Sequence, residues 1–348
     1  IEIKNNDKNI NTLAPYKLVK TMRAGVLVLG SLLTKYGKAK VSLPGGCAIG
    51  TRPVDLHLFA LKKLGAKIKI KNGYILAEAK KGLKGTIINF PSISVGATEN
   101  ALLAACQARG KTVLKNCAIE PEIIDLITFL NKLGSKINFK GRTISIYENK
   151  FTSLNISHEV IFDRIELGTY MIACALLARN NVIIDKIDPK IVKNEINVLK
   201  TIGVKVIKKK SSIIIKKNKK LKKINITTKP YPGFPTDLQA QLMVLLTQVE
   251  GVSKIKENIF ENRYMHVPEL KRMGAQIVIK GKTAIIKGPT KLTGAEVMAT
   301  DLRASVCLVL AGLIAENRTI INRIYHLDRG YEFLERKLKN CKAEIKRF

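Results

Sequence analysis

The sequence has few aromatic and few acidic residues. Of its 348 residues, 5% are aromatic and 27 are Asp or Glu, against 61 Lys and Arg, so the formal net charge is +34. Such a charge ordinarily indicates nucleic acid or an anionic membrane as a partner. The aromatic residues, however, do not interleave with the lysine runs at 208–210 and 216–223 as a base-stacking surface requires. These lysines flank short apolar strands, where charges are usually solvated. We therefore expect no nucleic-acid partner.

The sequence also lacks a long hydrophobic run and any Cys-x-x-Cys pair. Its longest apolar runs, such as 306–315, are too short to span a bilayer, and its first residues form no apolar signal segment. The six cysteines and four histidines show no zinc spacing. We expect a cytoplasmic protein with reduced thiols, no metal, no cofactor and no membrane partner. Cys106, Cys174 and Cys307 lie in apolar helical stretches and are predicted to be buried.

What the sequence does contain is a 46% hydrophobic fraction, enough for a substantial core, and an internal repeat. In each copy a helical segment ends at a glycine and an alternating apolar strand follows, usually with a turn and a second strand. The spacings between equivalent positions are 69, 69, 71 and 68 residues. These positions are Gly65, Gly134, Gly203, Gly274 and, with lysine in place of glycine, Lys342.

A second element, an apolar helix followed by a short strand, repeats in step with the first. Its five copies are 21–43, 98–116, 167–187, 237–256 and 301–323. The clearest hairpin is 66–78, with Asn72-Gly73 at its turn. Such units cannot bury their faces alone, so we expect them to pack as trios into two α/β domains, residues 1–160 and 161–348. One repeat before Gly65 would begin ahead of Ile1, so we expect the first unit to be largely missing.

A glycine-rich loop at 43–53 holds one cysteine and one arginine. Glycines let the backbone approach a ligand, and the Arg52 guanidinium suits a phosphate or carboxylate. A nearby cation would also lower the pKa of the Cys47 thiol and make it a better nucleophile. The loop is not a Walker P-loop. The residues alone leave two interpretations open, a functional Cys47 and an incidental loop thiol.

Asp237 lies at the start of an apolar helix, and a related start carries Asp301. Taken alone, Asp237 is best interpreted as an N-cap or first-turn carboxylate that complements the helix dipole, with a functional acid as the alternative. Several arginines also stand at loops or helix starts in a chain otherwise rich in lysine. Planar guanidinium groups suit a substrate with phosphate and carboxylate, although each could form an ordinary ion pair. They are Arg23, Arg52, Arg263, Arg303 and Arg329.

Together these motifs resemble one family, the UDP-N-acetylglucosamine enolpyruvyl transferases. The matching segments are 14–16, 21–24, 44–57, 94–98, 120–122, 163–166, 234–237, 260–266 and 328–332. The resemblance runs over the whole chain. It implies an inverse α/β barrel fold of two similar domains, each of three βαβαββ units. It also implies a cytoplasmic, monomeric transferase of peptidoglycan synthesis that moves the enolpyruvyl group of phosphoenolpyruvate to the 3′-hydroxyl of UDP-N-acetylglucosamine and releases phosphate.

The same resemblance implies catalytic roles. Cys47 would protonate the enolpyruvyl methylene and can form a covalent adduct, and Asp237 would take the proton of the sugar hydroxyl. Arg52, Arg303 and Arg329 would hold the phosphate and carboxylate of phosphoenolpyruvate.

The resemblance further implies a nucleotide-sugar site and a closing motion. Arg263 would help close the domains, and residues 44–50 would act as a lid that excludes water. The residues implied to line the nucleotide-sugar site are Arg23, Arg52, Pro53, Val54, Asp55, Leu56, Ser92, Ile93, Ser94, Val95, Asp237 and Ile259.

One departure and two rival hypotheses accompany this resemblance. The family's Ser-Gly-Ala-Lys-Asn motif, whose Lys-Asn pair contacts phosphoenolpyruvate, has no counterpart, so we expect imperfect folding or weak activity. The first rival is the related enzyme that uses shikimate 3-phosphate, which Cys47 and the nucleotide-sugar motifs argue against. The second is an inactive basic remnant that binds nucleic acid, which the intact Cys47, Arg52, Asp237 and Arg329 oppose.

Overall fold

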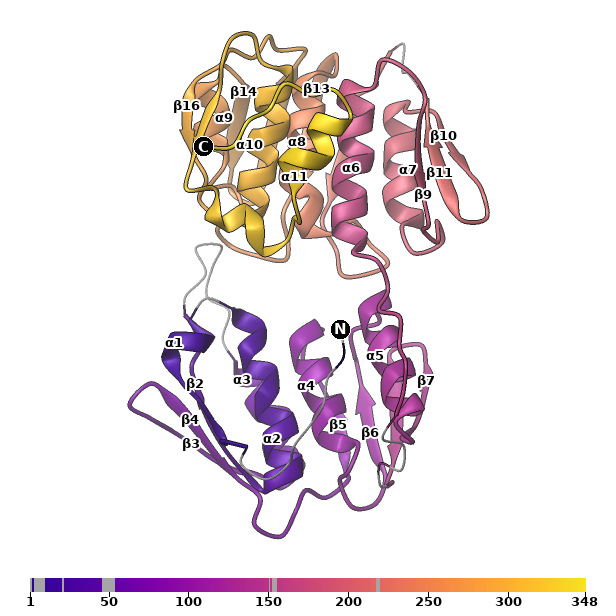
Figure 1. Cartoon of the computed structure of the whole chain (residues 1–348), viewed down its shortest axis with the longest axis vertical. Helices are drawn as coiled ribbons and strands as arrows, with labels where there is room; N and C mark the ends of the chain where they lie inside the picture. Colours follow the sequence, from indigo (N-terminus) through magenta and orange to yellow (C-terminus); the bar gives the residue numbers. More distant parts are fainter. Residues whose placement is uncertain are drawn as a thin grey trace. The chain divides into compact units, whose positions relative to one another are not determined.

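The computed structural model describes residues 2, 10–20, 22–45, 54–149, 151, 155–216 and 220–348. Among these residues the chain divides into two compact units, the first ending at Ile161 and the second running from Phe162 to Phe348 (Figure 1). The buried hydrophobic residues form separate clusters, one confined to the first unit and two confined to the second. Both units contain helices and sheets, as the predicted α/β class requires.

The two sheets of the first unit share one topology. The first has the order β1 (Leu13–Ala14), β2 (Lys38–Ser42), β4 (Tyr74–Glu78), β3 (Lys67–Lys71). The second has the order β5 (Ile87–Asn89), β6 (Thr112–Lys115), β8 (Thr143–Tyr147), β7 (Lys136–Lys140). In each sheet the first pair is parallel and the others are antiparallel. The helices are α1 (Tyr16–Val19), η2 (Arg23–Leu27), α2 (Val28–Tyr36), α3 (Asp55–Lys63), α4 (Val95–Ala105) and α5 (Pro121–Lys132).

The second unit repeats that topology once. The repeated sheet has the order β12 (Asn225–Thr227), β13 (Gly251–Lys256), β15 (Thr283–Gly288), β14 (Gln276–Lys280). A three-stranded sheet has the order β10 (Val206–Lys208), β11 (Ser212–Ile215), β9 (Val182–Asp185), and β16 (Glu296–Met298) pairs with β17 (Ile320–Asn322). The helices are α6 (Arg164–Leu177), α7 (Lys193–Ile202), η3 (Thr236–Leu238), α8 (Gln239–Thr247), α9 (Val267–Arg272), α10 (Leu302–Ile314), η4 (Ile324–Arg329) and α11 (Leu334–Asn340).

The predicted repeat is confirmed at its helix ends. All five equivalent positions adopt the left-handed conformation, with φ between +94° and +104° at the four glycines and +65° at Lys342. In every copy the next amide donates to a carbonyl five residues back, as Ala66 N does to Leu61 O and Ala343 N to Leu338 O. This is the Schellman arrangement, which satisfies carbonyl groups that the helix leaves without partners. The predicted hairpin is also confirmed, with positive φ at both Asn72 and Gly73.

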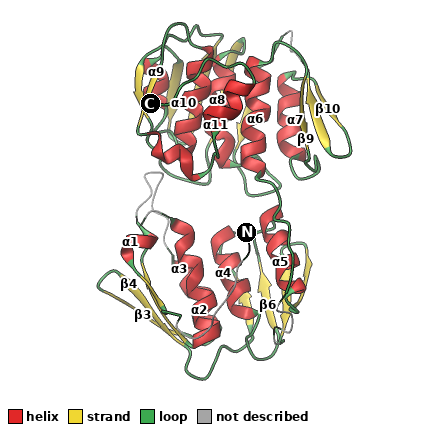
Figure 2. Ribbon diagram, viewed as in Figure 1, coloured by secondary structure: helices red, strands yellow, loops and turns green. Residues whose placement is uncertain are grey.

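The helices form the interior of each unit. In the first unit α4 packs against α2, α3 and α5, and in the second α8 packs against α6 and α10. The strands lie towards the outside of each unit (Figure 2). All nine residues of α8 are buried, and α10 is buried from Ala304 to Ala311. A helix enclosed on all sides has no polar face to leave exposed, which explains the apolar composition of both segments.

The described cysteines are free thiols. Cys106 and Cys307 are fully buried as predicted, and burial raises the pKa of Cys106 to about 11. Cys174 on α6 is only partly buried, so its predicted burial is confirmed only in part. Within the described ranges no helix combines the length and the apolar character needed to cross a bilayer.

Candidate active site

Three of the predicted site residues, Cys47, Arg52 and Pro53, lie outside the described residues. The remaining ones fall into two groups, one in each unit.

In the first unit the predicted sugar-binding residues collect at three helix starts. Arg23 opens η2, Val54 and Asp55 begin α3, and Ser92, Ile93, Ser94 and Val95 lead into α4. Gly96 brings two of these starts into contact, because a Cβ there would lie 3.0 Å from Cε1 of His57. Leu56 precedes His57 on α3 and is partly buried against the core of the first unit. Helix starts present unpaired N–H groups and positive dipole ends, which suit an anionic ligand.

A buried hydrogen-bond cluster fixes these helix starts. Asn100 of α4 accepts a bond from Gly30 N at 2.8 Å and donates to Val26 O at 3.2 Å. Its Nδ2 also lies 3.1 Å from Nδ1 of His57, so this ring nitrogen accepts the bond and the imidazole is neutral. Burial, with the nearby Arg23 charge, lowers the pKa of His57 to about 4. One buried amide thus ties η2, α2 and α3 to α4.

Ser94 has a structural role of its own. Its Oγ accepts a hydrogen bond from Ala97 N at 3.3 Å, and its carbonyl accepts one from Thr98 Oγ1 at 2.8 Å. These bonds are those of an N-cap residue. A ligand at this position would therefore meet the N–H groups of a capped helix.

In the second unit Asp237 is not an N-cap residue, but it lies in the first turn of η3, which is the other form of the helix-start interpretation. The N-cap of η3 is Pro235, and the Asp237 carboxylate instead binds two arginines. Arg263 Nη2 donates to Oδ1 at 2.5 Å, and Arg303 Nη2 donates to Oδ2 at 3.2 Å. The Asp237 side chain is 38% exposed, whereas the side chains of Arg263 and Arg303 are 5% and 12% exposed. An accessible carboxylate thus stands between two nearly buried guanidinium groups.

Behind Arg303 lies a buried polar network. Arg303 Nη1 donates to Tyr331 Oη at 3.3 Å, and that hydroxyl is 2.8 Å from Thr169 Oγ1. Gln241 Nε2 donates to both hydroxyls and, at 3.0 Å, to the carbonyl of Asp237. Burial opposes the charge of Arg303, but the neighbouring Asp237, Tyr331 and Asp163 outweigh it and raise its pKa. The arginine therefore stays charged in a largely dry environment.

Arg329 ends η4 and is exposed. The following Gly330 packs on α10, since a Cβ there would lie 2.9 Å from Leu302 Cδ2. Arg347 anchors the same turn through two bonds to Asp328, at 2.7 and 2.6 Å. Arg329 therefore precedes a residue that contacts the start of α10, the helix that carries Arg303.

Ile259 lies in the loop that follows β13, and its backbone is held by a carboxylate. Glu257 Oε1 accepts hydrogen bonds from Ile259 N at 2.7 Å and Phe260 N at 3.1 Å. Arg263 comes from the same loop and lies over the Phe260 ring, 5.6 Å from its centroid. The second unit therefore brings together four predicted site residues, Asp237, Ile259, Arg263 and Arg303, with Arg329 nearby.

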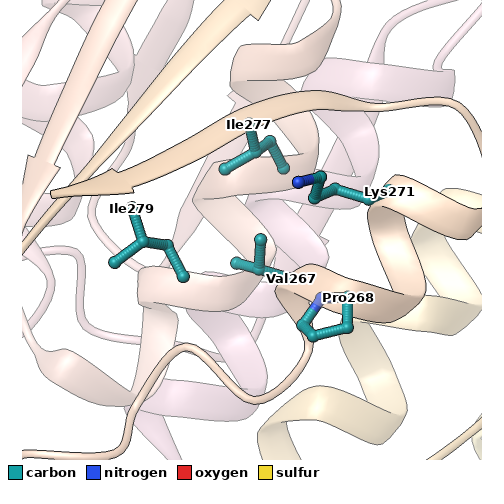
Figure 3. Close-up of a pocket in the computed structure, with 5 residues that line it drawn as sticks. All are labelled: Val267, Pro268, Lys271, Ile277 and Ile279. Atoms are coloured by element: carbon teal, nitrogen blue, oxygen red, sulfur yellow. The ribbon is translucent and has the colours of Figure 1, made fainter.

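Two hollows of the surface lie away from the described site residues. One of about 430 Å³ is bordered by Val267, Pro268 and Lys271 of α9 and by Ile277 and Ile279 of β14 (Figure 3). A similar hollow in the first unit involves Ile137, which occupies the position of Ile277 in the repeat. None of the described site residues borders either hollow. Both are features of helix-on-strand packing within the repeat.

Several residues around the site were missed by sequence analysis. Gln241 could have been found, because it lies one helical turn after Asp237, where side chains share a face. Tyr331 follows the Arg329-Gly330 pair and belongs to a segment that already resembled the family. Thr169 and Glu257 gave no signal, because their partners are distant in the sequence or are backbone groups.

Comparison with known proteins places this geometry in a family. Residues 2–338 match the family described as EPSP synthase (3-phosphoshikimate 1-carboxyvinyltransferase). A UDP-N-acetylglucosamine 1-carboxyvinyltransferase of Pelagibacter ubique is 60% identical over 98% of this chain and 82% of its own length. The protein of the same name from Rickettsia africae is 54% identical over 98% of this chain and 81% of its own length. The chain belongs to the family of UDP-N-acetylglucosamine 1-carboxyvinyltransferases, within the wider EPSP synthase family.

Solved structures agree with that membership. The enolpyruvyl transferase NikO from Streptomyces tendae has a TM-score of 0.83 and 26% identity, over 97% of this chain and 80% of that one. An EPSP synthase from Acinetobacter baumannii has a TM-score of 0.71 at 19% identity, over 93% of this chain and 78% of that one, and supports the fold alone. As a member of this carboxyvinyltransferase family the chain is a transferase acting on small molecules, and its predicted enolpyruvyl transferase fold is confirmed.

Proposed function

We propose that this chain transfers the enolpyruvyl group of phosphoenolpyruvate to the 3′-hydroxyl of UDP-N-acetylglucosamine and releases phosphate. The observation that carries the proposal is the Asp237 carboxylate held between Arg263 and Arg303. An accessible carboxylate suits proton transfer from a sugar hydroxyl, and fixed guanidinium groups suit the charges of phosphoenolpyruvate. The named activity of the 60% identical relative supports the same conclusion.

Asp237 is proposed to accept the proton of the attacking hydroxyl. Both of its oxygens accept bonds from arginines, so a sugar hydroxyl must compete for one of them. Arg303 binds only one oxygen of the Asp237 carboxylate, because Arg263 binds the other. The phosphate and carboxylate of phosphoenolpyruvate would be stronger anionic partners for Arg303. Binding of phosphoenolpyruvate would then draw Arg303 from Oδ2 and free that oxygen for the hydroxyl.

The reaction we propose has two stages. The sugar oxygen forms a bond to C2 of phosphoenolpyruvate while Cys47 donates a proton to the methylene carbon. In the second stage that carbon gives a proton back to the Cys47 thiolate, the double bond re-forms, and the bond between C2 and the phosphate oxygen breaks so that phosphate leaves. Arg52, Arg303 and Arg329 are proposed to hold the phosphate and carboxylate throughout. Residues 44–50, of which 46–50 lie outside the described residues, are proposed to act as a lid that excludes water.

The first unit is proposed to bind the nucleotide sugar. Arg23, residues 52–56 and residues 92–95 would contact it, with Asp237 and Ile259 contributing from the second unit. The clustering of the described members of this set at three helix starts supports a diphosphate ligand, because N–H groups there donate hydrogen bonds to anions. Arg263 is proposed to help the two units close. We further propose a monomeric, cytoplasmic enzyme of peptidoglycan synthesis that binds no nucleic acid.

Phosphate release from phosphoenolpyruvate, measured with and without UDP-N-acetylglucosamine, tests the proposal. We expect sugar-dependent release, its loss in Cys47→Ser, and a decrease in kcat of about 10²- to 10⁴-fold in Asp237→Asn. The matched control is Asp185→Asn, which changes an exposed carboxylate on β9 and should leave the rate unchanged.

Other outcomes would identify the rivals. Release that depends on shikimate 3-phosphate instead of the nucleotide sugar would assign the related enzyme. A salt-sensitive DNA mobility shift with no UDP-N-acetylglucosamine binding would favour the basic remnant. A folded chain that binds the sugar but releases no phosphate would contradict catalysis by this chain and leave a binding function.

A further inference from the structure

A buried carboxylate outside the predicted site joins the two segments that supply the site residues of the second unit. Glu257 is 2% exposed. Its Oε1 accepts hydrogen bonds from the backbone amides of Ile259 and Phe260, and its Oε2 accepts one from Thr236 Oγ1 at 2.8 Å. One side chain thus bridges the loop after β13 and the turn that carries Asp237.

The sheet fixes the position of this carboxylate. Glu257 directly follows β13, which pairs with β12 and β15, and its own amide donates to Lys282 O at 2.8 Å. The next amide, Asn258 N, donates to Thr228 Oγ1 at 3.0 Å. Because these two amides are bonded to the turn between β14 and β15 and to the residue that follows β12, the sheet holds Glu257 in place, and Glu257 in turn holds the loop.

Glu257 accepts hydrogen bonds from three neutral donors, two backbone amides and one hydroxyl. Bonds to an ionised acceptor are shorter and stronger than those between neutral groups, and a buried carboxylate depends on having them. Removal of the side chain would leave buried donors without acceptors. The loop and the turn would then rearrange to satisfy those donors.

We propose that Glu257 is a positioning residue for the nucleotide-sugar site, an inference that rests on the proposed function. Glu257 fixes the position of Ile259 relative to the Thr236–Asp237 turn. The loop surface at Ile259 and the Asp237 carboxylate are then held at a constant separation and orientation when the sugar binds. Displacements of about 1 Å in such sites cost up to about 100-fold in rate. Glu257 touches neither substrate in this proposal and acts through Ile259 and Asp237.

The chemistry of the three bonds provides a rescue variant. In Glu257→Gln the amide oxygen can face the two backbone N–H groups and the NH₂ group can face Thr236, whose hydroxyl accepts as well as donates. All three hydrogen bonds therefore survive without the charge. Glu257→Ala removes all three, and Thr236→Val removes one while keeping the side-chain shape.

Steady-state kinetics of the full chain, with calorimetric binding of UDP-N-acetylglucosamine, test the inference. We expect Glu257→Ala to raise KM and Kd for this sugar by about ten-fold, the factor that about 1.4 kcal/mol represents, with KM for phosphoenolpyruvate much less affected. Glu257→Gln should stay near wild type, and Thr236→Val should lie between. Glu250→Ala is the matched control, because this carboxylate precedes the other end of β13, pairs with Lys220 and is 70% exposed.

Loss of thermal stability in Glu257→Ala with unchanged KM and Kd for the sugar would overturn the inference. So would equal losses in the Ala and Gln variants, because the preserved hydrogen bonds would then have no effect. If Glu257→Ala does not fold, KM and Kd for the sugar are compared in Thr236→Val and Glu257→Gln instead. Unchanged values in Thr236→Val would then overturn the inference. A wild-type chain that binds no UDP-N-acetylglucosamine would overturn the proposed function and this inference together.

Discussion

His57 and His266 are buried histidines that lie close to arginine side chains. Burial lowers the pKa of His266 to about 4, with the Asp301 charge opposing and the Arg263 charge assisting this shift. Burial also lowers the pKa of His57 to about 4. Both imidazoles are therefore neutral at physiological pH, and protonation would place a charge in a desolvated site.

The folded state should lose stability in acid because of these two residues. An unfolded histidine titrates near pH 6.5, so the unfolded chain binds protons first as the pH falls. The stability due to neutral His57 and His266 is complete above about pH 6.5 and is lost towards pH 4. Urea unfolding at a series of pH values measures the loss. In His266→Phe, an apolar ring replaces the imidazole, and we expect a smaller slope over this interval.

Nuclear magnetic resonance of the imidazole protons gives an independent measurement. The chain has four histidines, so each signal can be assigned by a single substitution. Signals of His57 and His266 that titrate near 6.5 would contradict the structure, because such values belong to exposed imidazoles.

At the scale of elements, α2 and α4 approach closely at Gly30. A Cβ at this position would lie 2.3 Å from Oδ1 of Asn100 and 2.6 Å from its carbonyl oxygen. The close approach also permits the hydrogen bond from Gly30 N to that amide. A side chain here would therefore separate the two helices and break the cluster that holds the helix starts.

We expect Gly30→Ala to lower the free energy of unfolding by about 2–4 kcal/mol, through overpacking and loss of a buried hydrogen bond. Denaturant unfolding measures this quantity. Ser31→Ala is the control, because Ser31 is the exposed neighbour on the same helix and alanine favours helix formation. Equal effects of the two substitutions would show that α2 and α4 can move apart without cost.

The last helix, α11, ends at a residue poorly suited to its conformation. Lys342 adopts φ +65° where the four earlier copies of the repeat have glycine. Its amide donates to Lys339 O at 2.8 Å, so the Schellman bonds form in spite of the side chain. The left-handed conformation costs roughly 1 kcal/mol for a residue with a Cβ.

Lys342→Gly should therefore stabilise the second unit by about 0.5–1 kcal/mol, since glycine avoids this cost while gaining some freedom in the unfolded chain. The midpoint of urea unfolding, monitored in the second unit, tests the prediction. The reverse change, Gly65→Ala, should destabilise the first unit by a similar amount, because its Cβ meets no atom within 4 Å and backbone strain alone remains. A lower midpoint for Lys342→Gly would contradict the strain argument.

At the scale of the whole molecule, charge is the dominant feature. The net charge of +34 is spread over two units whose hydrophobic clusters are separate. Several ion pairs of the described residues, such as Lys220–Glu250, Lys291–Glu316 and Arg347–Asp328, lie at the surface. Surface pairs contribute little, whereas like charges across the molecule repel one another.

We expect the melting temperature to rise between about 10 mM and 300 mM sodium chloride, because the screening length decreases from about 30 Å to below 8 Å. Thermal unfolding followed by circular dichroism measures the effect. A melting temperature that falls with salt would indicate that attractive ion pairs outweigh the repulsion. Sucrose at matched osmolality separates screening from solvent effects.

The repeat, its helix ends and the hairpin at 66–78 were predictable because they depend on side-chain period and turn chemistry within a few residues. The sequence predicted the candidate site through the family's motifs, but it left the role of Asp237 ambiguous. The position of Asp237 at a helix start favoured an N-cap or first-turn carboxylate, and only the fold shows two arginines, 26 and 66 residues away, bound to it.

Contacts between distant segments were decided by tertiary structure alone. Glu257 binds Thr236 across 21 residues, Asn100 meets His57 across 43, and Thr169 meets Tyr331 across 162. No local period or turn preference encodes such pairs, because they depend on how the repeated units pack. The sequence by itself determined the repeated units and most of the residues proposed to meet substrate. The packing of those units decided which buried polar groups hold these residues in place.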